Sequence, residues 1–325
     1  MDHRDIDLTS VRLTQLFFRH PQHKALAEQF DLLLRRRRLE LKLGVKREVS
    51  GLLLIGDTGS GKSESVSRML ARYPDLVLGQ PGRMKAEFIK VRLRGGQGGL
   101  KGAGHAILSK LGFRLKGDKP SWVIWDMVRD ELRDRETLFL HIDEAQHIAS
   151  VQTPRARQAI IDTFKSLMQD DEWPVGLILS GMPAFKGLVN ADPRLARRLY
   201  PIEFGPMSPI ADGEMITDIV STYAAKGGVR CGPDLARRDF LPRPVHAGAR
   251  QFGVIVLRVI HAIDEALRDG DTVLGWQHFA REFRRKTGCI DGLNPFVVGL
   301  PLSVGPVSVL VHDRSLRQGG CLGRC

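Results

Sequence analysis

The chain has 325 residues, of which 42% are hydrophobic, enough to bury one large core or two modest ones without staples. Lys and Arg total 49 against 37 Asp and Glu, which gives a net charge of +12. This charge favours a polyanionic partner, nucleic acid before an acidic membrane; a solvated basic surface without such a partner is the alternative. The four cysteines show no CxxC pair or zinc spacing, and the chain is too long for a small disulfide framework. Because the N-terminus does not look like a signal peptide and no apolar run has membrane length, we expect a soluble, cytoplasmic protein with no membrane partner.

The first predicted element is a helical lead-in over residues 1–48. Apolar residues recur there at helix-like spacing, from Val11 to Phe18 and again from Leu26 to Leu33. The segment contains the charge run Arg35–Arg38, which we interpret as a solvated helix face in preference to a phosphate-binding site.

Residues 49–206 are predicted to form a doubly wound α/β domain. Short apolar runs predict strands, and one of them is apolar throughout, as a parallel strand covered on both faces should be. Helices are expected at 63–73 and 160–168, and strands at 51–55, 88–93, 137–142, 175–179 and 201–204. Because strands alternate with helices, we expect a parallel five-stranded sheet between helices.

From about residue 207 the pattern changes to helices alone. Segments 214–225 and 254–267 have clear helical periodicity, so we predict a small helical domain over residues 207–296. Residues 297–325 have no clear period and are predicted to be a disordered or aberrant tail without an assigned fold.

A phosphate-binding motif lies between the first predicted strand and the helix after it. The residues GDTGSGKS fit the pattern GxxxxGK followed by Ser or Thr in full. Glycines let backbone N–H groups wrap phosphates, Lys62 would reach the β- and γ-phosphates, and Ser63 would ligate magnesium. The sequence therefore predicts a site for ATP and Mg²⁺, with nucleotide-binding residues Gly56, Asp57, Thr58, Gly59, Ser60, Gly61, Lys62 and Ser63.

A second motif places two carboxylates at the end of the apolar strand LFLHI. Asp143 is expected to hold the magnesium, and Glu144 to orient and deprotonate the attacking water. A strand followed by a helix cap would look the same in isolation, but the phosphate motif upstream favours the catalytic interpretation. Ser180 ends the fourth predicted strand, where its hydroxyl could bond the attacking water or the γ-phosphate; a plain strand-end serine is the alternative.

Two further groups of cations are candidates for phosphate contacts. Arg197 and Arg198 precede the fifth predicted strand, where an arginine could be donated to a neighbour's γ-phosphate or could simply end a solvated helix. Arg92, Arg94 and Lys101 flank glycines after the second predicted strand, where they could follow DNA phosphates without reading bases or lie in a flexible solvated loop.

Four motifs in this order, GDTGSGKS, LFLHIDEAQHI, ILSGMP and DPRLARRLYPIEF, resemble AAA+ transposition ATPases of the TniB and TnsC type over about residues 5–296. The resemblance implies a P-loop NTPase of AAA+ type with a helical lid, Ser180 as sensor 1, and Arg198 or Arg197 as the arginine finger. It also implies a transposase partner, a homo-oligomeric ring or filament on double-stranded DNA, and ATP hydrolysis that dismantles the assembly.

The lid segment departs from the pattern of many AAA+ proteins. Apolar residues over 251–258 stand where a sensor 2 arginine is common, and Arg250 and Arg258 are the available substitutes. Slow or partner-stimulated hydrolysis is therefore expected. Two alternatives stay open: a replication initiator or loader, which would need a winged helix for DNA, and an ATP-gated scaffold of secretion type that does not bind DNA.

Overall fold

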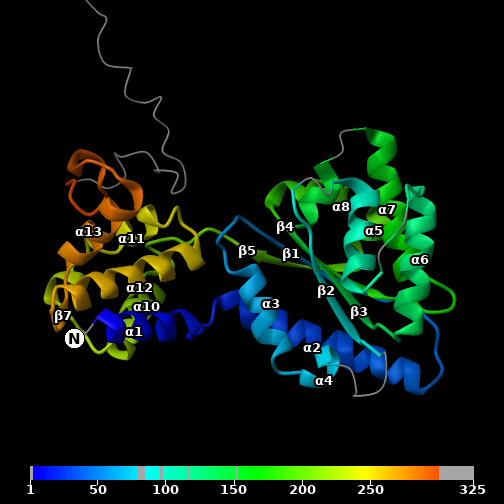
Figure 1. Cartoon of the computed structure of the whole chain (residues 1–325), viewed down its shortest axis with the longest axis horizontal. Coiled ribbons are helices and arrows are strands. Elements are labelled where there is room, and N and C mark those ends of the chain that lie inside the picture. The colour runs from blue at the N-terminus through cyan, green and yellow to red at the C-terminus, as the bar shows by residue number, and fades with distance from the viewer. Residues whose placement is uncertain are drawn as a thin grey trace, which may run out of the picture. The chain divides into compact units, whose positions relative to one another are not determined.

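The structure, a computed structural model, describes residues 3–78, 85–95, 98–113, 115, 117–150 and 153–299. The chain divides into two compact units (Figure 1): Arg19–Gly205, called here the α/β unit, and Met1–Phe18 with Pro206–Cys325, called the helical unit. Of the tail predicted over residues 297–325, the part from 300 onward lies outside the described residues. None of the helices in the described part of the chain has both the length and the apolar character that a membrane span requires.

The lead-in expected as one segment over residues 1–48 is divided between the two units. Its first helix, α1 (His3–Gln15), belongs to the helical unit, because Leu13 is buried in the core of that unit. Its second helix, α2 (Pro21–Lys42), belongs to the α/β unit, where Phe30 is fully buried. The two apolar stripes therefore cover different cores, a difference that periodicity does not contain.

The charge run on α2 is solvated only in part. Arg35, Arg36 and Arg38 are exposed, as expected. Arg37 is buried instead: its guanidinium donates to the carbonyl of Pro174 at 2.9 Å and lies 5.5 Å from the ring centre of Trp173. Arg37 thus anchors α2 to the α/β unit and is not part of a solvated face.

Five parallel strands form the sheet of the α/β unit, as predicted. They are β1 (Gly51–Gly56), β2 (Phe88–Arg92), β3 (Phe139–Asp143), β4 (Gly176–Gly181) and β5 (Leu199–Phe204), in the spatial order β2-β3-β4-β1-β5. Ile55 of β1 pairs with Gly181 of β4, and Ile142 of β3 pairs with Leu179. The register therefore brings the carboxyl ends of β1, β3 and β4 to one edge of the sheet, where ligands bind in this class of fold.

Helices cover both faces of this sheet (Figure 1). Alternate residues of β1 show the division: Leu53 and Ile55 pack in one core, Leu52 and Leu54 in the other. The first core also contains residues of α5 (Gly99–Lys110), α6 (Ser121–Asp134) and α7 (Pro154–Met168); the second contains residues of α2, α3 (Lys62–Leu70) and α4 (Pro74–Leu78). Short helices complete the unit: η1 (Ala145–Ser150), η2 (Pro183–Phe185), α8 (Lys186–Asn190) and α9 (Pro193–Ala196).

The glycine-rich stretch after β2 is not only a loop, because α5 begins at Gly99. Glycines disfavour helix, but Ile107 and Leu108 bury fully against the sheet and outweigh that preference. Gly104 serves packing: a Cβ there would lie 2.5 Å from Cγ2 of Ile124 on α6, so only glycine allows the two helices this contact.

The helical unit is built around α12 (Phe252–Arg268), which has buried residues along most of its length. Its other helices are α1, α10 (Gly213–Lys226), η3 (Pro233–Ala236), α11 (Pro242–Ala247), α13 (Trp276–Thr287) and η4 (Asp291–Leu293). A small parallel pair of strands, β6 (Arg230–Cys231) and β7 (Val273–Leu274), was not predicted, since two residues are too few for a periodic signal.

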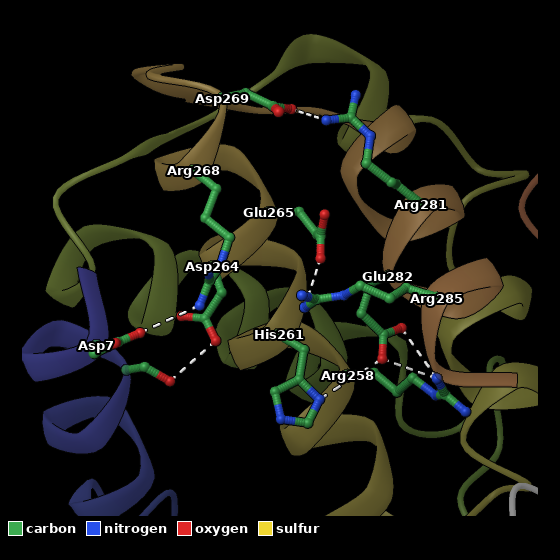
Figure 2. A network of polar contacts seen from close by, with 11 residues as sticks. Asp7, Arg258, His261, Asp264, Glu265, Arg268, Asp269, Arg281, Glu282 and Arg285 are labelled. Atoms are coloured by element: carbon green, nitrogen blue, oxygen red, sulfur yellow. Dashed lines mark hydrogen bonds and ion pairs between the residues drawn. The ribbon is translucent and has the colours of Figure 1, made fainter. Parts of the chain in front are cut away.

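Ion pairs link α12 to α13 and α1 within the helical unit (Figure 2). The most buried of them joins Arg258 to Glu282, with Nη1 2.8 and 3.1 Å from the two carboxylate oxygens. Asp264 accepts from the hydroxyl of Ser10 on α1 at 3.0 Å, and burial raises the pKa of this carboxyl. The cations of α12 are therefore committed to neighbours inside this unit.

Replacing Arg258 with Met should lower the free energy of unfolding by about 3–5 kcal/mol, because the buried carboxylate of Glu282 would lose its guanidinium partner and keep His261 at 3.7 Å. Adding Glu282→Leu to that variant should restore most of the loss, since two apolar side chains can pack where the pair lay. Urea unfolding of the full chain measures both effects. Equal loss in the single and double variants would contradict this account of the pair.

Candidate nucleotide-binding site

The loop after β1 has a backbone that glycine alone adopts easily. Gly59 and Gly61 have φ angles of 83° and 95°, in the left-handed region. At Gly56 the constraint is space: a Cβ would lie 2.6 Å from the carbonyl oxygen of Phe204. The predicted glycines are thus required by the loop itself, which wraps the start of α3.

Lys62 is held inside this loop. Its Nζ donates to the carbonyl oxygens of Gly56 and Asp57 at 2.6 and 2.9 Å, and to Oγ of Ser60 at 3.2 Å. Burial lowers the pKa of Lys62, and the carboxylates of Glu144, Asp143 and Asp57 oppose that shift. An ammonium group that is already surrounded by oxygen atoms can also bind phosphate oxygens. The first backbone N–H groups of α3 have no acceptor within the helix, so a phosphate could accept hydrogen bonds from them.

The two residues expected to ligate magnesium lie side by side. Oγ of Ser63, in the first turn of α3, lies 2.9 Å from Oδ2 of Asp143 at the end of β3. Asp143 is buried, with an exposed fraction of 1%. A hydroxyl and a carboxylate beside a phosphate-binding loop form a suitable partial shell for Mg²⁺, which prefers oxygen and keeps several waters.

Glu144 is the first residue after β3 and has a left-handed backbone, with φ of 59°. One carboxylate oxygen accepts from Nε2 of Gln146 at 2.5 Å, and the other lies 3.5 Å from Nη2 of Arg92. The side chain of Gln146 also accepts from the amide of Met182, after β4. Gln146 and Arg92 therefore hold the expected base from two sides, a role that the motif did not reveal for Gln146.

Ser180 lies inside the sheet beside a histidine. Both side chains are fully buried, and Nε2 of His141 on β3 is 2.7 Å from Oγ of Ser180 on β4. Burial, with Lys90 nearby, lowers the pKa of His141 to about 3, so the imidazole is neutral. A polar residue within an otherwise apolar strand was the only sequence signal for this contact.

The two candidate fingers differ sharply. Arg198 has 3% of its side chain exposed, and its guanidinium donates to Glu48 at 2.5 and 3.2 Å, so it is not placed to reach a neighbouring subunit. Arg197 has 64% of its side chain exposed. Arg197 is thus the more exposed of the two expected residues, and its guanidinium also lies 3.9 Å from Glu48.

The three residues expected to contact DNA do not all line the same pocket. Arg92 and Arg94 line a pocket of about 880 Å³ beside the edge strand β2. Lys101 does not line it; this residue of α5 pairs with Asp118 instead. In place of Lys101, the cations that complete the lining are Lys90 and Lys110, with His105.

Neither candidate for sensor 2 has a free guanidinium. Arg258 pairs with Glu282 as described, and Arg250 donates from Nε to the carbonyl of Met207 at 3.0 Å. Both contacts lie within the helical unit.

The chain resembles known proteins in sequence over one part and in fold over most of its length. Residues 46–189 match a family model described as an AAA domain, and no curated protein is significantly similar. Among solved structures, the ORC1 protein of Aeropyrum pernix in complex with DNA is 19% identical with a TM-score of 0.58, over 84% of this chain and 66% of that one. Cdc6p of Pyrobaculum aerophilum is 17% identical with a TM-score of 0.55, over 87% of this chain and 72% of that one. Drosophila ORC bound to DNA is 12% identical with a TM-score of 0.56, over 89% of this chain and 67% of that one.

These identities show the fold alone, and the chain spans about two thirds of the length of the ORC1 chain. Fold and motif nevertheless agree, since the matched residues contain the phosphate-binding loop and both carboxylates at the carboxyl edge of the sheet. The α/β unit thus has a P-loop NTPase fold of AAA+ type, and residues 46–189 match the AAA domain model.

Proposed function

We propose that the protein is an ATPase that assembles on double-stranded DNA when ATP is bound, and that in this state it recruits or activates a transposase. Hydrolysis then dismantles the assembly. The proposal that the protein binds DNA rests on the position of Arg92, which lines the basic pocket and also lies 3.5 Å from the carboxylate of Glu144. A polyanion that draws Arg92 away would change the surroundings of the catalytic base.

The site residues have distinct roles in hydrolysis. Lys62 and the loop amides would bind the phosphates, while Ser63 and Asp143 would hold Mg²⁺, which would supply charge neutralisation when bound. Glu144 accepts the proton of the attacking water at its carboxylate, and Ser180 donates to the γ-phosphate or to that water. With Lys62 buried and Asp143 almost fully so, these interactions act in a poorly hydrated environment, where they are stronger than in water.

Assembly would complete the site. Arg197 is proposed to reach the γ-phosphate of a neighbouring subunit, because its side chain is 64% exposed whereas that of Arg198 is buried in its ion pair with Glu48. An arginine supplied in this way stabilises charge that Lys62 alone does not. Hydrolysis should then depend on contact between subunits.

The basic pocket is the proposed DNA surface. Its polar lining comes from both sides of the strand edge: β2 and the residues after it contribute Lys90, Arg92 and Arg94, and α5 contributes His105 and Lys110. None of the described residues that line it is acidic. Several basic side chains gathered in one pocket are suited to phosphate contacts that ignore base sequence, and one of them, Arg92, also lies 3.5 Å from Glu144.

Transposition is the more specific part of the proposal and is supported by the four motifs over residues 5–296. A replication initiator or loader is the second candidate, because the fold likeness to the ORC and Cdc6 proteins fits it equally well. Co-expression with the transposase encoded by the same element separates them. ATP-dependent retention of that transposase on DNA supports a role in transposition; retention of a helicase in its place supports the second candidate.

Removing two cations of the pocket tests the DNA surface. The double variant Arg94→Ala, Lys110→Ala should weaken duplex binding about tenfold per residue at 0.1 M salt and lower the salt slope of log Kd by roughly one for each. Lys24→Ala, which removes an 84% exposed charge of α2, serves as the control and should change little. Unchanged affinity and slope in the double variant would place DNA elsewhere.

A further inference from the structure

The contact between His141 and Ser180 determines which way the serine hydroxyl can donate. A serine has one hydroxyl proton and a neutral imidazole has one N–H. If Nε2 accepts the serine proton, the hydroxyl has none left for the γ-phosphate. If Nε2–H donates to Oγ, the hydroxyl keeps its proton for another acceptor. The tautomer of His141 therefore matters for the chemistry of Ser180.

The surroundings of His141 select one tautomer. Its Nδ1 is buried and has no hydrogen-bond partner among the described residues. With the proton on Nδ1, the protein would contain a buried N–H without an acceptor, which folded proteins rarely tolerate. With the proton on Nε2, Nδ1 is an unpaired acceptor, a more common condition, and the N–H points at an oxygen 2.7 Å away. The second arrangement is favoured.

Ser180 also lies where such a proton would be useful. Ile142 pairs with Leu179 across β3 and β4, so the next residues along the two strands, Asp143 and Ser180, are neighbours at the same edge. His141 and Asp143 are two residues apart on β3 and so face the same side of the sheet, where Asp143 contacts Ser63 of α3. The buried pair thus adjoins the magnesium ligands.

We propose that His141 is a positioning residue: its Nε2–H donates to Oγ of Ser180 and leaves the serine proton free to donate to the γ-phosphate or the attacking water. The inference rests on the proposed function, because it requires that Ser180 acts in hydrolysis. This hydrogen bond would explain why a histidine occurs in β3, where the other buried residues before Asp143 are apolar.

The tautomer can be measured in the wild-type protein without any activity assay. In the full chain labelled with ¹⁵N at histidine, the His141 resonances, assigned by their loss in His141→Gln, should show a protonated Nε2 and an unprotonated Nδ1. The reverse pattern, with the proton on Nδ1, would overturn the inference. Because this measurement does not involve ATP, it remains decisive if the proposed ATPase activity proves absent.

Kinetics test whether the contact acts through Ser180. His141→Phe should lower kcat about tenfold with little change in nucleotide affinity, as loss of an orienting partner typically does. His141→Gln, whose amide can donate to Ser180, should recover much of that loss. In a Ser180→Ala background, His141→Phe should have no further effect on kcat. The same tenfold decrease in that background, or failure of Gln to improve on Phe, would show a merely structural role.

Discussion

Glu144→Gln is expected to bind ATP as the wild type does and to hydrolyse it about 10²–10⁴ times more slowly. The amide oxygen of the new side chain can still accept from Gln146, so the loop should keep its shape. An amide is no base, however, and the attacking water would keep its proton. Single-turnover hydrolysis and nucleotide affinity, measured together, separate the two effects.

Glu136→Gln is a matched control for this variant. Glu136 also has a left-handed backbone, with φ of 52°, but it lies in the turn before β3 and pairs with Lys85. The same chemical change there should leave hydrolysis within about twofold of wild type, as a surface substitution should. If Glu144→Gln hydrolysed ATP at the control rate, another group would have to be the base.

Lys62→Ala should reduce nucleotide affinity by about 10²-fold or more, since charged hydrogen bonds to phosphate are among the strongest that a side chain makes. Folding should be little affected, because alanine is favourable in the first turn of α3 and the hydrogen bonds described for Lys62 go to its own loop. Titration with a fluorescent ATP analogue measures the loss. Lys186→Ala, which removes an exposed lysine paired with Glu203, is the control.

Mixed subunits extend this experiment to the arginine finger. Lys62→Ala and Arg197→Ala subunits should each be inactive alone, yet a mixture should regain part of the activity, because the former can lend Arg197 to the nucleotide of the latter. A mixture of Lys62→Ala with Arg198→Ala is the comparison. Recovery only in that second mixture would make Arg198 the finger, in spite of its ion pair with Glu48.

Local patterns were enough to predict the five strands of the large sheet and the phosphate-binding loop. The central strands β1 and β4 are short, mostly apolar runs, and the loop from Gly56 to Ser63 depends on residues adjacent in the chain. Asp143 and Glu144 could be placed for the same reason, since they follow directly on a buried strand. For these elements sequence neighbours are also structural neighbours.

The features that the sequence did not predict depend on contacts between residues that are far apart in the chain. Arg198 is buried by Glu48, which lies 150 positions away, and His141 meets Ser180 across 39 positions. Helix α5 forms in a glycine-rich stretch because Ile107 has a core to enter. Neither local propensity nor motif spacing contains the location of such partners.

The central claim is that ATP binding gives the protein a DNA-bound, assembled state. Duplex DNA binding by Glu144→Gln, with and without ATP, across a salt series and with particle size recorded, tests it most directly. We expect binding that requires ATP, weakens as salt rises and is accompanied by large particles. ATP binding at normal affinity without any DNA binding at low salt would contradict the claim and favour an ATP-gated scaffold for protein partners.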